Sequence, residues 1–354
     1  ITNLCRVTAF GSVRRMRPGA WGLLLVCALR ATAFAAGSER LETLGSPDGQ
    51  IRLRVSFPES AAGGQPRWSA TYRGKSLMDG CELGLRVAGE GDLCRGVRVV
   101  SERRRSSDRE IPIRFGRASR GMDRFREARF TVQAPSGRQV DVVFRCYNDA
   151  VALRYELSRD GGTGPVVVED ELTSFRAVGE PRVYAQYLEH HKTSHEHRVT
   201  PVAWSAIPAG QLVDLPLTMG WPDGVHVAIT EASLRRYAGM ALMRAPGDGA
   251  ASALVGSLTP RADGNKVVRV GRLETPWRVV LIGDRPGALL ESTTLYCLND
   301  PPVGGDTLFA SMHAAYDALS DGLKATLGTM RAVHTADHIY GPQGFLANSD
   351  QGAD

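Results

Sequence analysis

One stretch of the chain concentrates side chains that could bind a metal ion or transfer a proton. It reads YLEHHKTSHEHRV and holds four of the eight histidines of the chain. Neutral imidazoles and carboxylates are common ligands of transition metals such as zinc. The spacing matches no helix-borne HExxH motif, and residues two apart on a strand point the same way without converging. We therefore favour a solvated loop over an intrinsic zinc site. The ionisable residues of the stretch are Glu189, His190, His191, His195, Glu196 and His197.

A second candidate is Glu231 in the segment ITEASL, where a carboxylate comes just after a predicted strand. Such a side chain can bind a ligand, and it can also serve a turn or cap by accepting hydrogen bonds from backbone amides. The tryptophans Trp68, Trp204, Trp221 and Trp277 extend the set. An exposed indole can stack on a sugar ring, whereas a buried one packs the core. We take Trp204, Trp221 and Glu231 as candidate substrate-binding residues, with core and turn roles as the alternatives.

Composition and missing motifs disfavour several classes of function. The sequence has no GxGxxG after a strand and no Walker loop for a nucleotide, and it has no GxSxG elbow for a serine nucleophile. Its net charge of +5 depends on residues 1–36, which hold five arginines and no acidic residue. Without that segment the net charge is zero (+5 − 5). We therefore expect no attraction to nucleic acid.

The first 36 residues have the features of a removable export signal. Met16 precedes the apolar stretch AWGLLLVCAL, which is too short to span a bilayer as a mature helix. The residues AFA at 33–35 match the small-x-small pattern of a signal peptidase site. We predict export to the periplasm or the cell exterior, with upstream read-through before Met16 and no membrane span in the mature chain. A buried helix is the alternative, and Arg30 within the apolar segment supports it.

Four cysteines follow that segment, at Cys81, Cys94, Cys146 and Cys297. An even number in an exported chain permits disulfides, and Cys81 with Cys94 is the nearest pair. Cys146 lies inside a predicted strand, where the expected role is that of a small buried hydrophobe. No CxxC spacing occurs, which disfavours a structural zinc site.

From position 47 onward the chain reads mostly as strands and turns. Ile51, Leu53 and Val55 alternate with polar residues, which is the period-two pattern of a half-buried strand. Similar short segments recur as far as position 298, among them the hairpin FRCYNDAVALRYEL at 144–157. About a dozen such strands predict a mainly β fold, namely a large antiparallel β-sandwich.

Other segments complete the predicted organisation. The Arg-rich span 101–127 is predicted to form long surface loops. In the hairpin, Arg154 and Glu156 are expected on the wet face, with an ion pair to Arg145. The segment ALLESTTLYCLND is predicted to hold a helical turn and then a last strand. Residues 310–334 carry apolar side chains at three- and four-residue spacing, which predicts a short α-helical C-terminal tail.

Six stretches together resemble the N-terminal domain of glycoside hydrolase family 97. They occur in the order of that family over about Leu44 to Pro302, although Ala150 and Leu153 stand where glycine and phenylalanine are usual. The resemblance implies a supersandwich of the galactose-mutarotase type, packed against a catalytic (β/α)8 barrel. The stretches are LGSPDGQIRLRV, ATYRGKSLMDGCELGLRV, VVFRCYNDAVALRYEL, HVAITEASLRRYAGMAL, ETPWRVVLIGD and LLESTTLYCLNDPP.

The same resemblance implies an exported, calcium-dependent α-glucosidase or α-galactosidase that acts on α-linked oligosaccharides. In that family the barrel supplies the catalytic carboxylates and most calcium ligands, while the sandwich lends one glutamate. By position that glutamate matches Glu196, and calcium prefers such hard oxygen ligands. His195 and His197 stand where polar or aromatic residues are expected.

The family pattern ends after Asp306. The 48 residues that follow (354 − 306) cannot build a barrel of ~250 residues, so no catalytic residue is expected in this chain. We interpret residues 1–36 as upstream residues and signal peptide, 37–305 as the sandwich, and 306–354 as a divergent tail from a truncated or frame-shifted reading. The predicted function is an accessory domain that shapes a sugar cleft. A free-standing carbohydrate-binding module and an envelope scaffold are the alternatives.

Overall fold

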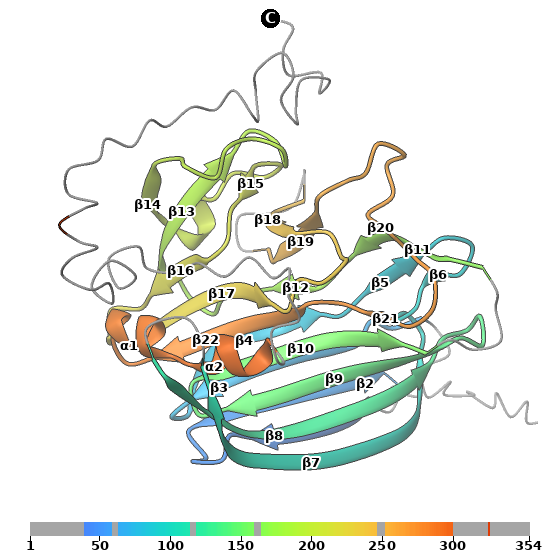
Figure 1. The fold of residues 1–354 in the computed structure, drawn as a ribbon, viewed down its shortest axis with the longest axis horizontal. Coiled ribbons are helices and arrows are strands. Elements are labelled where there is room, and N and C mark those ends of the chain that lie inside the picture. The colour runs from blue at the N-terminus through green and yellow to red at the C-terminus, as the bar shows by residue number, and fades with distance from the viewer. Residues whose placement is uncertain are drawn as a thin grey trace, which may run out of the picture. The chain divides into compact units, whose positions relative to one another are not determined.

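The computed structural model describes residues 39–58, 63–113, 118–158, 164–245, 252–299 and 325. The chain divides into two units, Ile1–Ala36 and Gly37–Asp354, and the described residues belong to the second. They form sheets with antiparallel strand pairs and two short helices (Figure 1). The predicted leader lies outside the described residues, and so does the predicted helix at 310–334 apart from residue 325.

The first sheet pairs four consecutive strands of the chain. In β2 the side chains of Ile51, Leu53 and Val55 are buried, and they alternate with exposed or half-buried ones. This alternation confirms the half-buried strand that the sequence predicted. In sheet order the strands are β1 (Glu39–Gly45), β2 (Ile51–Pro58), β3 (Arg67–Tyr72) and β4 (Lys75–Glu82).

The second sheet contains fourteen of the described strands, and a third, smaller sheet contains four. In sheet order the second is β12 (Ser174–Phe175), β19 (Leu254–Leu258), β18 (Met240–Met243), β15 (Leu212–Val213), β13 (Arg182–Leu188), β16 (Leu217–Gly220), β17 (His226–Ala232), β22 (Trp277–Gly283), β10 (Ala150–Leu157), β9 (Gln139–Tyr147), β8 (Arg120–Gln133) and β7 (Arg98–Pro112). Off this path, β14 (Val199–Ala203) pairs with β13, and β21 (Leu273–Glu274) pairs with β10. The third sheet is β20 (Val267–Arg269), β11 (Val166–Glu171), β5 (Leu85–Val87) and β6 (Gly91–Asp92).

The main core lies between the first sheet and the β7–β10 part of the second. Strand β1 contacts β8 and β2 contacts β9. In Figure 1, β2 lies in the layer behind β8 and β9. Phe57 on β2 and Phe130 on β8 meet with ring centroids 5.1 Å apart. Phe144 and Leu153 are buried in the same cluster. The fold is therefore the antiparallel β-sandwich that the alternation predicted.

Within the Arg-rich span, residues 101–112 and 120–127 lie in the long strands β7 and β8, so the predicted surface loops are wrong for these residues. Strands β7 and β8 pair along their whole length. Arginines on β7 meet acids on β8, for example Arg105 with Glu127 and Arg109 with Asp123. Such pairs let charged residues occupy a strand, and a charged outer strand also discourages pairing with other chains. The polar composition of a paired, charged ribbon therefore resembles that of a loop.

Two short helices follow β22. They are α1 (Pro286–Glu291) and α2 (Thr294–Leu298), so the predicted last strand in this segment is wrong. Cys297 and Leu298 of α2 are buried against the outer face of the large sheet. A short apolar run has no clear period, and helix and strand cannot be separated by pattern there. None of the helices within the described ranges has the length and apolar content to cross a membrane.

The four cysteines of the described residues are buried free thiols. The disulfide that the sequence permitted between Cys81 and Cys94 is therefore not formed. Burial raises the pKa of Cys81 and of Cys146 to about 12. Cys146 faces the main core, which confirms its expected role as a small buried hydrophobe.

Candidate functional site

A cavity of about 630 Å³ opens among β17, β18 and the segments that connect β13 to β16. Its lining combines apolar side chains with a few polar ones, which is the usual character of a small-molecule site. The apolar part includes Leu188, Leu215, Pro216 and Met240. The polar part includes His191, His195, Asp214, Glu231 and Asn299.

Glu231 is the next-to-last residue of β17, and it stands directly opposite Arg278 of β22. Arg278 Nη1 donates to Glu231 Oε2 at 2.5 Å. Arg278 Nε and Nη2 donate to the two carboxylate oxygens of Glu171 on β11, each at 2.7 Å. Arg278 and Glu171 are fully buried, whereas the Glu231 side chain is 17% exposed. Glu231 is therefore the cavity-facing end of a buried ion network.

The network has more negative than positive charge, because a single arginine is bonded to two glutamates. Tyr237 Oη and Thr173 Oγ1 also donate to Glu171, at 3.3 and 3.0 Å. Glu231 has a weaker set of partners: besides Arg278 it accepts a 3.5 Å contact from the Met240 amide. Burial raises the pKa of the Glu231 carboxyl, although the charge of Arg278 lowers it. Glu231 thus has fewer stabilising partners than Glu171, and it is the carboxylate of the two that lines the cavity.

Asp214 and His195 form a second polar group of the lining. Asp214 Oδ2 lies 2.8 Å from His195 Nδ1 and accepts a 2.8 Å hydrogen bond from Gln186 Nε2. The Asp214 side chain is 10% exposed and that of His195 is 61% exposed. A carboxylate on Nδ1 favours the tautomer with its proton there, which leaves Nε2 as an acceptor. Nearby, His191 Nε2 contacts Ser257 Oγ at 3.1 Å, and burial lowers the pKa of His191.

Glu196 lies in the loop between β13 and β14, next to the cavity-lining His195, and it is exposed. Its amide donates to Ser194 Oγ at 3.2 Å. The loop confirms the solvated segment that the histidine spacing predicted. Within the described ranges, no three His, Cys, Asp or Glu side chains form a group that could hold a metal ion. An exposed carboxylate can offer one ligand to calcium, which takes six to eight oxygens.

The two candidate tryptophans are buried and do not line the cavity. Trp204 begins the 3-10 helix η1 (Trp204–Ala206) and is 1% exposed, with Arg244 donating to its carbonyl oxygen at 3.0 Å. Trp221 is 8% exposed, and its Nε1 donates to Val178 O at 2.9 Å. Stacking on a sugar needs an exposed ring face. The structure therefore supports the core role over the stacking role at both positions.

Sequence reasoning missed Asp214 and Arg278. Asp214 is 19 residues from His195, and only the fold brings the two together. Arg278 did carry a signal, because it interrupts the apolar strand WRVVLIG. A long charged residue inside such a strand is rarely buried unless it is paired. That rule predicts a buried partner, although it does not identify Glu171 or Glu231.

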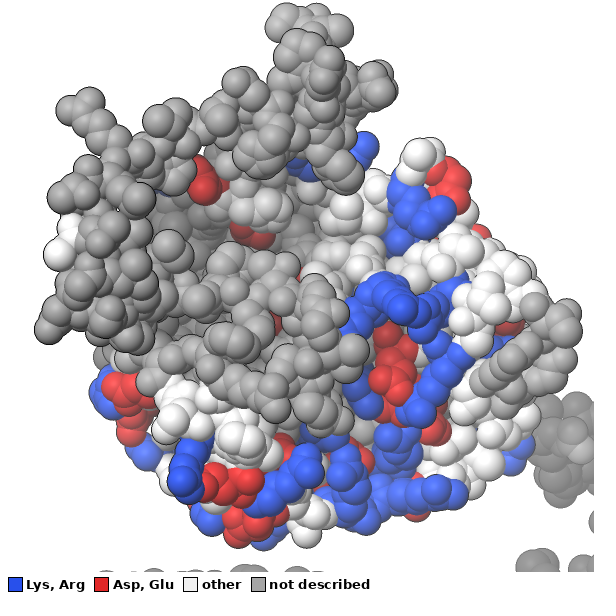
Figure 2. All heavy atoms as spheres, viewed as in Figure 1, with Lys and Arg blue, Asp and Glu red and all other residues white. Residues whose placement is uncertain are grey.

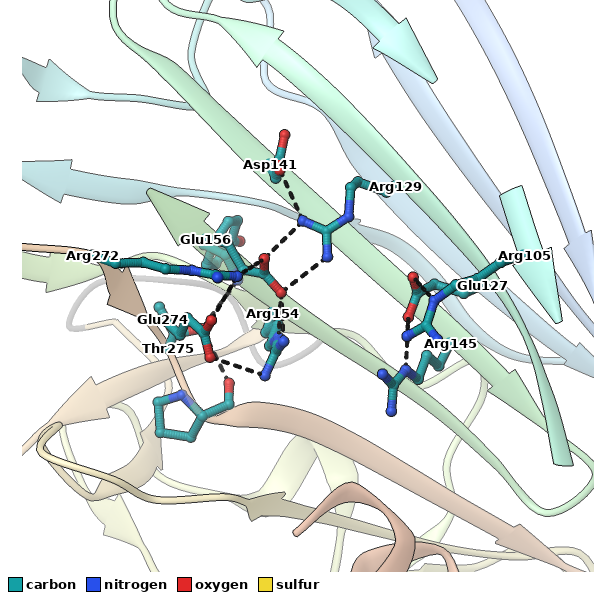
Figure 3. A network of polar contacts seen from close by, with 12 residues as sticks. Arg105, Glu127, Arg129, Asp141, Arg145, Arg154, Glu156, Arg272, Glu274 and Thr275 are labelled. Carbon is teal, nitrogen blue, oxygen red and sulfur yellow. Dashed lines mark hydrogen bonds and ion pairs between the residues drawn. The ribbon is translucent and has the colours of Figure 1, made fainter. Parts of the chain in front are cut away.

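A separate ion network covers the outer face of β8–β10, where Figure 2 shows basic and acidic side chains interleaved. Its centre is Glu156, which accepts from Arg129, Arg154 and Arg272 (Figure 3). These hydrogen bonds and charges outweigh the effect of burial and lower the pKa of Glu156 to about 2. None of these residues lines the cavity, and the ion pairs of the network join β8, β9, β10 and β21.

The predicted ion pair between the hairpin residues Glu156 and Arg145 is wrong, because Arg145 pairs with Glu127 instead. Register places Arg145 opposite Ala152 on one side and opposite Glu127 on the other. Arg145 Nε accordingly donates to Glu127 at 2.8 Å (Figure 3). Its guanidinium also lies 4.7 Å from the centre of the Trp277 ring. The expected wet face is therefore covered, because β10 is buried on both sides apart from Arg154, which is half-buried.

Two family models match the chain. The one described as Glycosyl-hydrolase 97 N-terminal matches residues 44–301. The other, described as Taurine catabolism dioxygenase TauD, TfdA family, matches residues 291–353, most of which lie outside the described residues. The truncated or frame-shifted origin of residues 306–354 stays a prediction.

Two curated relatives are similar over part of their length. A probable retaining alpha-galactosidase of Streptomyces bingchenggensis is 25% identical over 276 residues, which are 77% of this chain and 41% of the relative. A retaining alpha-galactosidase of Bacteroides thetaiotaomicron is 24% identical over 233 residues, which are 63% of this chain and 33% of the relative. The chain thus spans about two fifths or less of the length of these relatives.

Solved structures agree with this assignment. A glycoside hydrolase family 97 enzyme from Pseudoalteromonas sp. strain K8, in complex with acarbose, has a TM-score of 0.65 and 25% identity over 75% of this chain and 39% of its own. A beta-arabinopyranosidase has the same fold, with a TM-score of 0.59 and 22% identity over 69% of this chain and 40% of its own. Because the first family model covers most of the described residues, this chain belongs to glycoside hydrolase family 97 and contains its N-terminal domain.

Proposed function

We propose that this chain is the accessory N-terminal domain of an exported family 97 glycosidase that acts on α-linked galactosides or glucosides. The family match supports this, and so do two relatives named as retaining alpha-galactosidases and a solved relative that holds acarbose. The relatives extend well beyond the matched part, which leaves room for a (β/α)8 barrel. Retention of configuration requires two carboxyl groups about 5 Å apart at the reacting carbon. In this proposal the barrel supplies both.

The cavity beside Glu231 is the observation that carries the accessory role. A pyranose ring has apolar C–H faces and a rim of hydroxyl groups. The cavity offers Leu188 and Met240 for the faces, and the carboxylates of Glu231 and Asp214 as acceptors for the hydroxyls. Arg278 holds Glu231 in a fixed position, so little side-chain entropy is lost when a sugar binds. Glu231 is the residue that we propose to contact substrate.

Calcium is the proposed metal of the complete enzyme, with Glu196 as one of its ligands. The exposed position of this carboxylate, one residue from the cavity lining, supports the assignment. The remaining oxygen ligands would come from the barrel. A bound calcium ion supplies a fixed positive charge that orients and polarises substrate oxygens. Glu196 would place that charge at the edge of the sugar cleft.

The proposal is tested by binding and turnover with the full chain. The chain should not hydrolyse p-nitrophenyl α-D-galactopyranoside or its glucose counterpart, because in this proposal the barrel supplies the catalytic pair. It should bind methyl α-D-galactopyranoside or methyl α-D-glucopyranoside at millimolar concentration in a titration followed by NMR. Glu231→Gln should weaken that binding about two- to fivefold, the effect of one hydrogen bond. Turnover by the chain, or the absence of any sugar binding, would contradict the accessory role.

A further inference from the structure

Glu171 on β11 lies behind the cavity lining and shares one guanidinium with Glu231. Arg278 donates to both carboxylate oxygens of Glu171, through Nε and Nη2, and its Nη1 donates to Glu231. The two parallel bonds to Glu171 form a bidentate pair, which is a strong arrangement between arginine and a carboxylate. The guanidinium is shielded from water, because its side chain has no exposed surface. The cavity-facing carboxylate therefore receives one of the three hydrogen bonds of a single cation.

A chain of buried hydroxyl groups fixes Glu171 from the other side. Tyr237 Oη donates to its Oε2 at 3.3 Å, and Thr173 Oγ1 donates to its Oε1 at 3.0 Å. Tyr155 Oη lies 2.9 Å from Thr173 Oγ1 and accepts from the Gly84 amide at 3.1 Å. Because the Thr173 hydrogen points at Glu171, the Tyr155 hydroxyl donates to Thr173. All these donors are directed towards Glu171, so they stabilise its negative charge.

Glu231 is exposed to the charge of Glu171 through this arrangement. Burial raises the pKa of Glu231, and the negative charge of Glu171 raises it further, whereas the charge of Arg278 lowers it. The other titratable groups around the cavity are Tyr237 of the loop after β17 and the lining residues His191, His195 and Asp214. Glu171 itself does not line the cavity. Its effect on the lining therefore passes through Arg278 and the field of its own charge.

We propose that Glu171 is a positioning residue of the sugar cleft: by drawing Arg278 towards itself, it keeps the carboxylate of Glu231 available to accept hydrogen bonds from a ligand. The inference rests on the proposed function and deepens it, because it names the residue that controls the same site from behind. Without the charge of Glu171, Arg278 would serve Glu231 alone. Glu231 would then take up a proton less readily and accept hydrogen bonds from a ligand less strongly.

Glu171→Gln tests this coupling in the full chain, with EDTA present so that no calcium ion adds charge beside Glu196. The Glu231 carboxyl is titrated by carbon NMR, and its signal is assigned by its loss in Glu231→Gln. Glu171→Gln should lower the midpoint of this titration by at least about one pH unit, a tenfold change in proton affinity. The pH at which the chain loses affinity for methyl α-D-galactopyranoside should move down with it. A cavity that is merely loosened would lose affinity at every pH instead.

Glu156→Gln is the matched control, because Glu156 is 3% exposed and paired with arginines but does not line the cavity. It should leave the Glu231 midpoint unchanged. A thermal melt checks that each variant is folded. If Glu171→Gln does not fold, Tyr237→Phe decides: it removes one donor to Glu171, so the midpoint should rise.

An unchanged midpoint in Glu171→Gln, or the absence of a rise in Tyr237→Phe, would overturn the role of Glu171 while leaving the sugar-cleft proposal standing. The same midpoint shift in Glu156→Gln as in Glu171→Gln would also overturn that role. The expected shifts without sugar binding at any pH would support the control of Glu231 by Glu171 and overturn the proposed function.

Discussion

Arg278 and Glu231 face each other directly across strands β22 and β17. The same guanidinium holds Glu171 on β11, which belongs to the smaller sheet. One buried cation therefore joins two sheets and fixes the position of a cavity-lining carboxylate. Its side chain has no exposed surface, so the guanidinium is shielded from water.

Replacing Arg278 with methionine should lower the free energy of unfolding by about 3–5 kcal/mol. The reason is that two carboxylates would then stay buried without a cation. Unfolding in urea at pH 7 measures the effect. The control Arg124→Met removes an arginine that is 44% exposed and paired with Asp108, and it should cost less than about 1 kcal/mol. Equal losses in the two variants would show that the buried network has no special energetic role.

Glu156 should make the stability of the sandwich sensitive to acid. Its pKa is held at about 2 in the folded chain, below the ordinary value of 4.5. The unfolded chain therefore takes up this proton more readily than the folded one. The stabilisation from Glu156 is fully present above pH 4.5, and it is lost as pH falls towards 2.

The variant Glu156→Gln tests this linkage. At pH 7 it should lower the free energy of unfolding by up to about 3 kcal/mol, which corresponds to the shift of the pKa. At pH 3 the difference from the original chain should be about half as large or less, because Glu156 is then almost fully protonated in the unfolded chain and still mostly ionised in the folded one. Urea unfolding at both pH values gives the two differences. A difference that does not change with pH would contradict the assigned pKa.

The sandwich could be predicted from sequence because strands such as β2 have one buried, apolar face and one exposed or half-buried face. In β2 each buried residue is followed by an exposed or half-buried one, and the period of two is visible in the residue types. Strand β7 has no such contrast, since none of its residues is fully buried. Its charged side chains are explained by partners on β8, such as Glu127 for Arg105, which no local pattern reveals.

The candidate site was predictable only in part. Glu231 stands at the end of an apolar strand, and the sequence marks such a carboxylate as unusual. The pair Asp214–His195 depends on how β15 and the loop after β13 come together. The roles of the tryptophans could not be predicted, because an indole gives the same sequence signal whether it packs a core or faces a sugar. Burial, which decides between these roles, is a property of the fold.

The four cysteines of the described residues should be unreactive in the folded chain. Burial raises the pKa of Cys81, Cys146 and Cys297 to about 12, and the thiolate is the reactive form. Treatment with a maleimide at pH 7 should leave these three and Cys94 unlabelled, and unfolding in urea should expose all of them. Peptide mass spectrometry assigns each label. A peptide pair linked through Cys81 and Cys94 would contradict the free thiols.

Trp204 should contribute to stability and not to sugar binding. Trp204→Ala removes a fully buried indole and should lower the free energy of unfolding by about 3–5 kcal/mol. Trp204→Phe keeps most of the packing and should leave the affinity for methyl α-D-galactopyranoside unchanged within about twofold. The exposed Tyr184 provides a control, since Tyr184→Ala should change stability by less than about 1 kcal/mol. Loss of affinity in the folded Trp204→Phe variant would restore a stacking role.

Calcium should bind this chain only weakly. Among the described residues Glu196 is not part of any group that could hold a metal, and one carboxylate replaces few of the six to eight oxygens around the ion. We expect a dissociation constant on the order of millimolar or higher by calorimetry, and no shift of the melting temperature at lower calcium concentrations. Glu196→Gln should weaken the residual binding and leave the melting temperature unchanged, because the side chain is exposed. Micromolar binding by the chain would mean that its own residues complete the site, and a destabilised Glu196→Gln variant would mean that this glutamate supports the loop instead of a metal.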